Sequence, residues 1–286
     1  MPTVTKNLII INVLMFIATL ALSMHGVDLE QWLALHFVLA SDFNPLQLVT
    51  YMFMHGSWSH ILFNMFAVWM FGRIMETTWG PQRFFLFDMV CGIGAGLIQE
   101  AAQYLHFYYE GLDAYDQVRT PIGAVLPMTE YLNGWCTVGA SGAVYGILLA
   151  FGMTFPDETL FIFPIPVPIK AKYFVAGYAV IEVLEALGQN DNVAHCAHLG
   201  GMLFGLLLIL YWDGRLKLPS FSTQRSRHKT RMNVHQGGAK LTPDEEYNLR
   251  RQQRQAEVDR ILKKVHEHGY GSLTEQEKRT LFNAGK

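Results

Sequence analysis

Two short stretches of this sequence decide its fold. The first is Gly139-Ala140-Ser141-Gly142-Ala143-Val144-Tyr145-Gly146, and the second is Ala197-His198-Leu199-Gly200-Gly201-Met202-Leu203-Phe204-Gly205. Each opens a long apolar segment and places one polar residue, Ser141 or His198, a few positions inside it. Unpaired polar groups inside a bilayer are costly, so these two side chains are candidates to pair with each other at a functional site.

The composition predicts an integral membrane protein. Of 286 residues, 51% are hydrophobic and 16% are charged, and the mean hydropathy is +0.18. Several of the apolar segments are shorter than the roughly 20 residues that span a typical bilayer. The apolar segments number six in all, at residues 8–24, 58–72, 84–105, 138–155, 170–188 and 194–212. We therefore expect an all-α, polytopic bundle of six transmembrane helices.

The distribution of charge predicts how these segments are oriented. Residues 1–214 hold 6 of the 22 Lys and Arg residues, and the other 16 follow. The connections with Lys6, with Arg73 and Arg83, and with Lys170 and Lys172 alternate with connections rich in Asp and Glu. The positive-inside rule then predicts a multi-pass protein with both termini in the cytoplasm. We expect it in the cell's inner (plasma) membrane.

This topology predicts which polar residues meet. The segments that contain Ser141 and His198 both run inwards, so at 1.5 Å per residue both side chains lie roughly 5 to 10 Å below the outer surface. The second segment runs the same way and opens with His60 and Asn64, which are four residues apart and share one helical face. Four polar side chains from three segments are thus expected at one depth, within reach of external water.

The residue types at this depth favour acyl transfer. A serine hydroxyl becomes an effective nucleophile when a histidine takes its proton, so Ser141 is the candidate nucleophile and His198 the candidate general base. His60, Asn64 and the backbone N–H of Ser141 are candidate donors to the oxyanion of the tetrahedral intermediate. No acidic residue is well placed in the sequence to orient His198. The nearest, Asp191, belongs to the preceding loop, and we therefore predict a dyad.

Glycines predict how the serine and histidine helices meet. Gly142 and Gly146 in the fourth segment, and Gly201 and Gly205 in the sixth, have the spacing that lets transmembrane backbones approach closely. A short serine side chain needs such an approach to reach a histidine on another helix. Glycine ridges are common packing devices, so they support the pair without establishing it.

These motifs resemble those of the rhomboid intramembrane serine proteases. The similarity is carried by His55-x-x-x-x-His60-x-x-x-Asn64, by Gly139-x-Ser141-Gly142 with Tyr145 one turn later, by Ala197-His198-x-x-Gly201-x-x-x-Gly205, and by Glu76, Gly80 and Arg83. It covers about residues 5–212. The resemblance implies a rhomboid-like six-helix bundle, a Ser-His dyad that needs no cofactor, and transmembrane proteins as substrates. We expect His55, Gly139, Tyr145 and His195 to line the active site.

The first external loop departs from the family pattern. Many rhomboids carry a Trp-Arg pair there, and the corresponding positions in this sequence are Leu46 and Gln47. Contacts of the loop with lipid are therefore expected to differ. Its apolar residues still suit a structure lying in the membrane interface. They are Trp32, Leu33, Leu35, Phe37, Val38 and Leu39.

Two other groups of residues suggest alternative chemistry. His195, Cys196 and His198 raise the possibility of a zinc site. The sequence has no His-Glu-x-x-His, and no second cysteine or carboxylate stands at ligand spacing, so we predict no metal. Glu182 and Glu185 in the fifth segment suggest an ion pathway. We interpret them instead as structural polar groups near segment ends or facing the bundle.

The sequence changes character after residue 214. Residues 215–241 are predicted to be a basic flexible linker near anionic lipid, and residues 242–286 a cytoplasmic helical module. Thr242-Pro243-Asp244-Glu245 predicts the start of a helix that runs to Gly269. Ser272-Leu273-Thr274-Glu275 is a capping box that predicts a second helix. This hairpin resembles a module of some bacterial rhomboids. Its partner is unknown, and we expect no nucleic acid despite its basic charge.

Two functions from different classes remain. The favoured function is a serine endopeptidase that works in contact with membrane lipid and cleaves transmembrane protein substrates near their outer ends. The alternative is a non-catalytic rhomboid-like protein that binds membrane helices. Loss of either Ser141 or His198 would favour the binding protein, and both residues are present. A transporter is a distant third reading, because the sequence has no detectable repeat symmetry.

Overall fold

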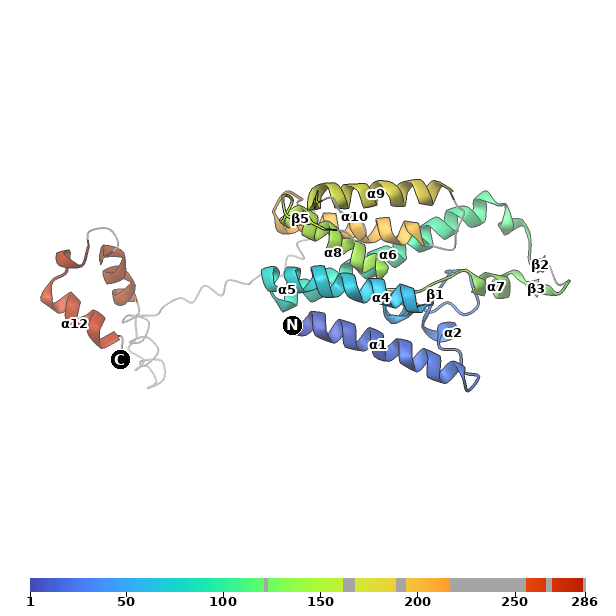
Figure 1. The fold of residues 1–286 in the computed structure, drawn as a ribbon, viewed down its shortest axis with the longest axis horizontal. Coiled ribbons are helices and arrows are strands. Elements are labelled where there is room, and N and C mark those ends of the chain that lie inside the picture. The colour runs from blue at the N-terminus through green and yellow to red at the C-terminus, as the bar shows by residue number, and fades with distance from the viewer. Residues whose placement is uncertain (121–122, 162–167, 189–193, 217–255, 266–268, 285–286) are drawn as a thin grey trace, which may run out of the picture. The chain divides into compact units, whose positions relative to one another are not determined.

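The chain folds into two compact units, Met1–Ser220 and Phe221–Lys286 (Figure 1). The structure is a computed structural model that describes residues 1–120, 123–161, 168–188, 194–216, 256–265 and 269–284. These residues are mostly helical and include three antiparallel pairs of very short strands. The first unit carries all the candidate site residues.

Long helices of the first unit fall on the predicted apolar segments. Among the described residues, α1, α6 and α10 are long and apolar enough to cross a membrane, and α8 is a shorter apolar helix. The structure therefore has the several apolar helices expected of a membrane protein. The helical elements on these segments are α1 (Thr3–Ser23), α4 (Trp58–Ala67), the π-helical turn η2 (Val68–Gly72), α5 (Arg73–Trp79), α6 (Pro81–Tyr109), α8 (Ser141–Thr154), α9 (Ala171–Gly188) and α10 (His195–Trp212).

Short elements connect these helices. The first loop contains α2 (Glu30–Leu33), β1 (Leu35–His36), α3 (Gln47–Thr50) and the 3₁₀ turn η1 (Tyr51–Phe53). Between α6 and α8 lie η3 (Leu112–Ala114), β2 (Gln117–Arg119), β3 (Val125–Pro127), α7 (Met128–Tyr131), η4 (Leu132–Gly134) and β4 (Cys136–Thr137). β5 (Thr159–Leu160) and β6 (Ile169–Lys170) pair between α8 and α9. β1 pairs with β4, so the first loop is tied to the strand that leads into α8.

The contact between α8 and α10 confirms the close approach predicted from the glycines. A Cβ added at Gly201 would lie 1.8 Å from the carbonyl oxygen of Gly142. One added at Gly146 would lie 2.5 Å from Sγ of Cys91 on α6, and one at Gly142 would lie 2.3 Å from Cβ of Ala95. No side chain fits at these positions, so the backbones of α8 and α10 meet directly and α6 packs against both.

Glu76 joins the start of α1 to α5. Its Oε1 accepts a hydrogen bond from the backbone N–H of Val4 at 2.9 Å. Its Oε2 accepts from the N–H and the hydroxyl of Thr5, both at 2.7 Å. A helix N-terminus has free N–H groups and a positive dipole end, so this buried carboxylate acts as a cap supplied by another helix.

Gln47 organises the first loop from a buried position. Its Oε1 accepts from the backbone N–H groups of His36 at 3.3 Å and Asn44 at 3.0 Å. Its Nε2 donates to the carbonyl oxygens of Trp32 at 3.2 Å and Asp42 at 2.9 Å. One neutral amide thus uses two donors and an acceptor oxygen to hold four backbone positions of the loop. The neighbouring Leu46 is 71% exposed.

The predicted interfacial role of the first loop needs correction for two residues. Leu35 and Phe37 are fully buried inside the protein. Leu35 belongs to the main hydrophobic core, and Phe37 packs with Phe107 and Leu132 in a second cluster. Trp32 remains 62% exposed, as a residue at the membrane interface would be. The division follows the elements of the loop, because Trp32 lies on the short helix α2, whereas the run from Ala34 to Phe37, which includes β1, is buried throughout.

The C-terminal unit contains helical residues 256–265, the 3₁₀ turn η5 (Tyr270–Ser272) and α12 (Glu275–Ala284). The predicted linker lies almost wholly outside the described residues, as does the predicted helix start at residues 242–245. The predicted capping box is wrong by two residues. Thr274 Oγ1 accepts from the N–H of Glu277 at 3.3 Å, and Glu277 Oε2 accepts from the N–H of Thr274 at 2.8 Å. Ser272 instead donates to the carbonyl oxygen of Gly269, the residue before η5.

Candidate active site

Ser141 and His198 lie within hydrogen-bond distance, with Oγ 2.9 Å from Nε2. Ser141 is the first residue of α8, and His198 lies in the first turn of α10. The direct contact between Gly142 and Gly201 holds these two helix starts together. His198 is 8% exposed, so the pair is largely shielded from solvent. A hydroxyl beside an imidazole nitrogen is the arrangement needed for proton transfer from a nucleophile to a base.

A carboxylate from α9 completes the environment of His198. Glu182 Oε2 lies 2.8 Å from Nδ1 of His198 and 2.7 Å from Nδ1 of His195. Its Oε1 accepts a hydrogen bond from the hydroxyl of Tyr145. The expectation that no acidic residue is well placed beside His198 is therefore wrong. Glu182 is buried and hydrogen-bonded, as the interpretation of a polar group facing the bundle predicted. Asp191, the nearest acid in the sequence, lies outside the described residues.

Tyr145 and His195 both reach the site, as expected. The ring of Tyr145 stacks on the imidazole of His198, with centroids 4.3 Å apart and planes inclined by 11°. His195 lies one turn before His198, and its ring meets that of His198 edge-on, with centroids 6.0 Å apart. The stacked ring of Tyr145 and the hydrogen bond at Nδ1 together leave the His198 ring little freedom to rotate.

His60 and Gly139 meet close to Ser141. A Cβ added at Gly139 would lie 2.7 Å from Nε2 of His60, and Gly139 has φ +129°. Both facts demand glycine, because a side chain would be strained there and would occupy the space of the imidazole. The ring of His55 packs edge-on against that of His60, with centroids 5.0 Å apart. His60 thus lies beside the backbone that enters α8.

Three candidate hydrogen-bond donors come from α4 and from the start of α8. Ser141 begins α8, and the first N–H groups of a helix have no intrahelical partner. Asn64 is 6% exposed, and its Nδ2 has no partner among the described residues. His60 and Asn64 lie one turn apart on α4, whose N-cap is Ser57. An unused buried amide donor is costly in a resting protein, which suits a group that serves a transient negative charge.

Glu182, His195 and His198 also form the cluster best suited to a metal ion among the described residues, with ligand atoms within 4.8 Å of one another. The Glu–His separations of 2.7 and 2.8 Å are hydrogen-bond distances. Two ligands of a tetrahedral zinc ion, each at about 2.0 to 2.1 Å from the metal, would stand about 3.3 Å apart. The geometry therefore fits hydrogen bonds without rearrangement, whereas a metal would require the cluster to open.

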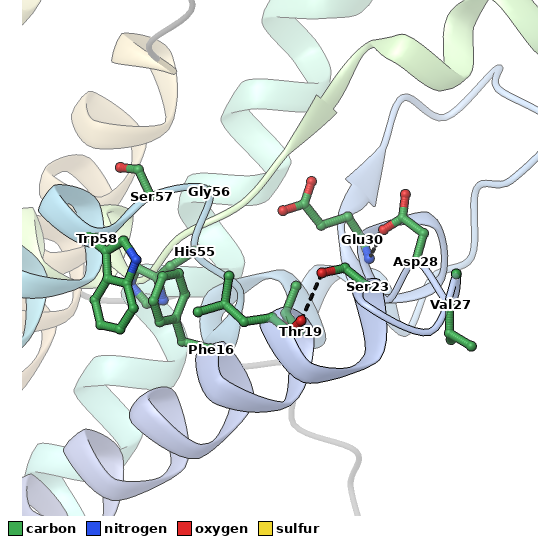
Figure 2. A pocket seen from close by; sticks show the side chains of 12 residues that line it. Phe16, Thr19, Ser23, Val27, Asp28, Glu30, His55, Gly56, Ser57 and Trp58 are labelled. Carbon is green, nitrogen blue, oxygen red and sulfur yellow. Dashed lines mark hydrogen bonds between the residues drawn. The ribbon is translucent and has the colours of Figure 1, made fainter.

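A cavity of about 490 Å³ adjoins the site (Figure 2). It lies between the end of α1 and the segment before α4, and its lining includes Phe16, His55 and Trp58 on one side and Asp28 and Glu30 on the other. Burial and the nearby Asp28 raise the pKa of Glu30. Ser141 and His198 are not among the lining residues, so the cavity approaches the site through His55 and does not enclose the catalytic pair.

Comparisons with known proteins identify the family of this chain. The rhomboid domain family model matches residues 43–213, more than half of the chain. This chain belongs to the rhomboid family. A family of unknown function, DUF6576, matches residues 241–283. The chain is a membrane protein, and its relatives support intramembrane protease activity in general.

Three curated relatives illustrate the range of the family. Rhomboid protease AarA of Providencia stuartii is 27% identical over 55% of this chain and 52% of its own length. Rhomboid protease GlpG of Yersinia pseudotuberculosis is 26% identical over 64% of this chain and 54% of its own length. RHOMBOID-like protein 12, mitochondrial, of Arabidopsis thaliana is 32% identical over 54% of this chain and 42% of its own length. The chain spans about half the length of the curated relatives it matches.

Sequence reasoning missed Glu182, although one signal for it existed. Glu182 lies six residues before the end of α9 at Gly188, which is about 9 Å at 1.5 Å per residue. The depth argument that brought Ser141 and His198 together would have placed this carboxylate at the same level. Because α9 is expected to run outwards, the depth has to be counted back from its C-terminal end.

Proposed function

We propose that this chain is an intramembrane serine endopeptidase that hydrolyses peptide bonds in or near transmembrane helices of membrane-protein substrates. The observation that carries the proposal is the 2.9 Å separation between Ser141 Oγ and His198 Nε2 in a shielded site. Membership of the rhomboid family supports the same reaction class. We further propose six membrane spans with both termini in the cytoplasm, supported by the alternation of basic and acidic connections, and an inner (plasma) membrane location, which bacterial relatives such as AarA support.

The proposed reaction begins when Ser141 attacks the carbonyl carbon of the scissile peptide. The hydroxyl proton passes to Nε2 of His198 as the new C–O bond forms. His198 then gives this proton to the departing amine, and a water molecule hydrolyses the acyl-enzyme by the same steps in reverse order. No redox step or cofactor is required by this sequence of bond changes.

The oxyanion of the tetrahedral intermediate is assigned to three donors. The N–H of Ser141 lies at the positive end of the α8 dipole, and His60 lies against the backbone at Gly139. Asn64 supplies an amide donor that no described group uses. Removal of one such donor typically costs roughly 100- to 1000-fold in turnover.

The test combines proteolysis with active-site labelling. Purified protein is incubated with a model transmembrane substrate in bilayers and, separately, with a fluorophosphonate probe. We expect the wild-type chain to cleave the substrate and to be labelled, and Ser141→Ala to do neither while keeping the same thermal midpoint. Cleavage by Ser141→Ala at the wild-type rate would refute the serine mechanism. Substrate binding by a wild-type protein that neither cleaves nor labels would support the non-catalytic helix-binding protein instead.

A further inference from the structure

The C-terminal half of α9 buries a single side chain, the carboxylate of Glu182. The buried residues of α9 are Ala171, Val175 and Glu182, and Glu182 alone lies beyond the helix midpoint. Its neighbours Ile181 and Leu184 are 52% and 63% exposed. Burying a carboxylate is costly unless hydrogen bonds compensate, so apolar packing does not account for the position of Glu182.

The partners of Glu182 determine which nitrogen of His198 carries the proton. An ionised carboxylate accepts hydrogen bonds and has none to donate. Nδ1 of His198, 2.8 Å from Glu182 Oε2, must therefore carry a proton. In a neutral imidazole this leaves the lone pair on Nε2, which faces Ser141 Oγ at 2.9 Å. This is the tautomer that can accept a proton from serine.

The carboxylate is itself fixed by two further donors. His195 donates from Nδ1 to Oε2, and Tyr145 donates its hydroxyl to Oε1. Glu182 is only 5% exposed, so water does not compete effectively for these bonds. The Glu182 side chain thus has one orientation in which every donor is satisfied, and that orientation presents an oxygen to His198.

We propose that Glu182 is the positioning residue of His198, making a Ser141-His198-Glu182 arrangement in place of a two-residue site. Glu182 holds the ring and its tautomer, and its negative charge stabilises the imidazolium formed when Ser141 transfers its proton to Nε2. Glu182 exchanges no proton, because the transferred proton stays on Nε2 until it passes to the leaving amine. This inference rests on the proposed function.

The central variant is Glu182→Gln, which keeps the shape of the side chain and removes its charge. An amide can present its NH₂ to Nδ1 and so favour the wrong tautomer. We expect turnover of the model substrate to fall roughly 100- to 10,000-fold with apparent affinity unchanged, as for loss of the orienting acid in a Ser-His-Asp site. Glu182→Asp should recover part of this loss. The control is Glu185→Gln, an exposed carboxylate on the same helix, with wild-type turnover expected.

A spectroscopic measurement separates positioning from a purely structural role. In protein labelled with ¹⁵N-histidine, the His198 signals are identified by their absence in His198→Ala. We expect wild-type His198 to be protonated at Nδ1 and Glu182→Gln to show a mixture of tautomers at an unchanged thermal midpoint. If Glu182→Gln unfolds, Glu182→Asp replaces it in the comparison, because aspartate keeps the charge. A folded Glu182→Asp that keeps the wild-type tautomer and part of the turnover supports the proposal.

The outcomes distinguish this inference from the function on which it rests. An active Ser141→Ala would refute the proposed function. An inactive Ser141→Ala together with wild-type turnover in Glu182→Gln would refute only the positioning role. A loss in Glu182→Gln that is confined to apparent affinity would also refute the positioning role. So would activity that disappears with a chelator and returns with zinc, because the Glu182 cluster would then hold a metal.

Discussion

The contacts that α10 makes with α8 and with α9 are built on opposite principles. Between α8 and α10, Gly142 and Gly201 bring backbone against backbone, and no side chain intervenes. Between α9 and α10, the site-facing contact depends on the carboxylate of Glu182 and its hydrogen bonds to two histidines. The first contact sets the distance between Ser141 and His198 by sterics, and the second sets the orientation of His198 by charge. Stability and turnover should therefore respond differently when each is changed.

The largest effect is expected at the glycine contact. In Gly201→Ala the new methyl group would overlap the carbonyl oxygen of Gly142, 1.8 Å away, and the two helices must separate. We expect a loss of about 1 to 3 kcal/mol in stability, as for other overpacked sites, and loss of detectable proteolysis. Thermal unfolding and turnover in bilayers measure the two effects. The matched control is Gly177→Ala on α9, where an added Cβ has no neighbour within 4 Å. Wild-type behaviour of Gly201→Ala would contradict the contact.

The second change tests whether the α9 contact serves turnover as well as stability. Glu182→Leu replaces the buried carboxylate by an apolar side chain, so the hydroxyl of Tyr145 and Nδ1 of His198 lose their acceptor. A buried donor that loses its acceptor costs about 1 to 3 kcal/mol. We expect a lower thermal midpoint together with a turnover per folded molecule reduced roughly 100- to 10,000-fold. A variant that loses stability while the remaining folded protein turns over normally would reverse this interpretation.

Alanine at His60 or Asn64 should have a smaller effect than either change above. Each removes one candidate oxyanion donor and leaves the contacts of α8, α9 and α10 unaltered. We expect turnover to fall roughly 10- to 1000-fold, with little change in apparent affinity because the interaction strengthens only in the transition state. Labelling by a fluorophosphonate should slow without vanishing. Unchanged turnover with weaker binding would move these residues from catalysis to substrate recognition.

The smallest effect on proteolysis is expected from acidity at the C-terminal unit. Hydrogen bonds from the N–H of Thr274 and from Lys264 lower the pKa of Glu277 to about 2. A group with a lowered folded-state pKa contributes stability above its unfolded value of 4.5, and this contribution is lost as the pH falls towards 2. We expect hydrogen-exchange protection of α12 in the full chain to fall over that range.

Two variants check this acid response. Glu277→Gln should give low protection at every pH, and Glu275→Gln, on the same helix at an exposed position, should follow the wild type. Proteolysis by both variants at neutral pH should equal that of the wild type. An acid response in Glu277→Gln as large as in the wild type would assign the effect to other groups.

Much of the site was predictable because it depends on depth. Ser141, His198, His60 and Asn64 each open an apolar segment, and residue counting from the segment ends gives their level in the membrane without knowledge of packing. The glycine spacing likewise indicated a close helix contact, which the positions of Gly142 and Gly201 confirm. The catalytic roles of these residues stay predictions until they are measured.

Other features could not be predicted from local pattern. Leu35 and Phe37 were predicted to be interfacial, but both side chains are buried. Leu35 pairs with Thr137 of β4, and the N–H of Phe37 donates to the carbonyl oxygen of Trp135. Ser272 and Thr274 are each followed three residues later by a glutamate, so both can cap a helix. Ser272 belongs to the η5 turn, and Thr274 is the residue that caps α12. Gln47, read only as a departure from a family pattern, holds four backbone groups of the first loop. In each case a distant contact or a neighbouring turn chose between local alternatives.

The sequence by itself determined the membrane setting and the apolar segments, and it predicted the level of a candidate nucleophile and base, because hydropathy and rise per residue are properties of each segment alone. Only the tertiary structure decided that Glu182 meets His198. That contact depends on how α9 is rotated about its axis and which helices it lies beside, and these follow from the fit of all helices together. Neither quantity is encoded in the spacing between Glu182 and His198 along the chain.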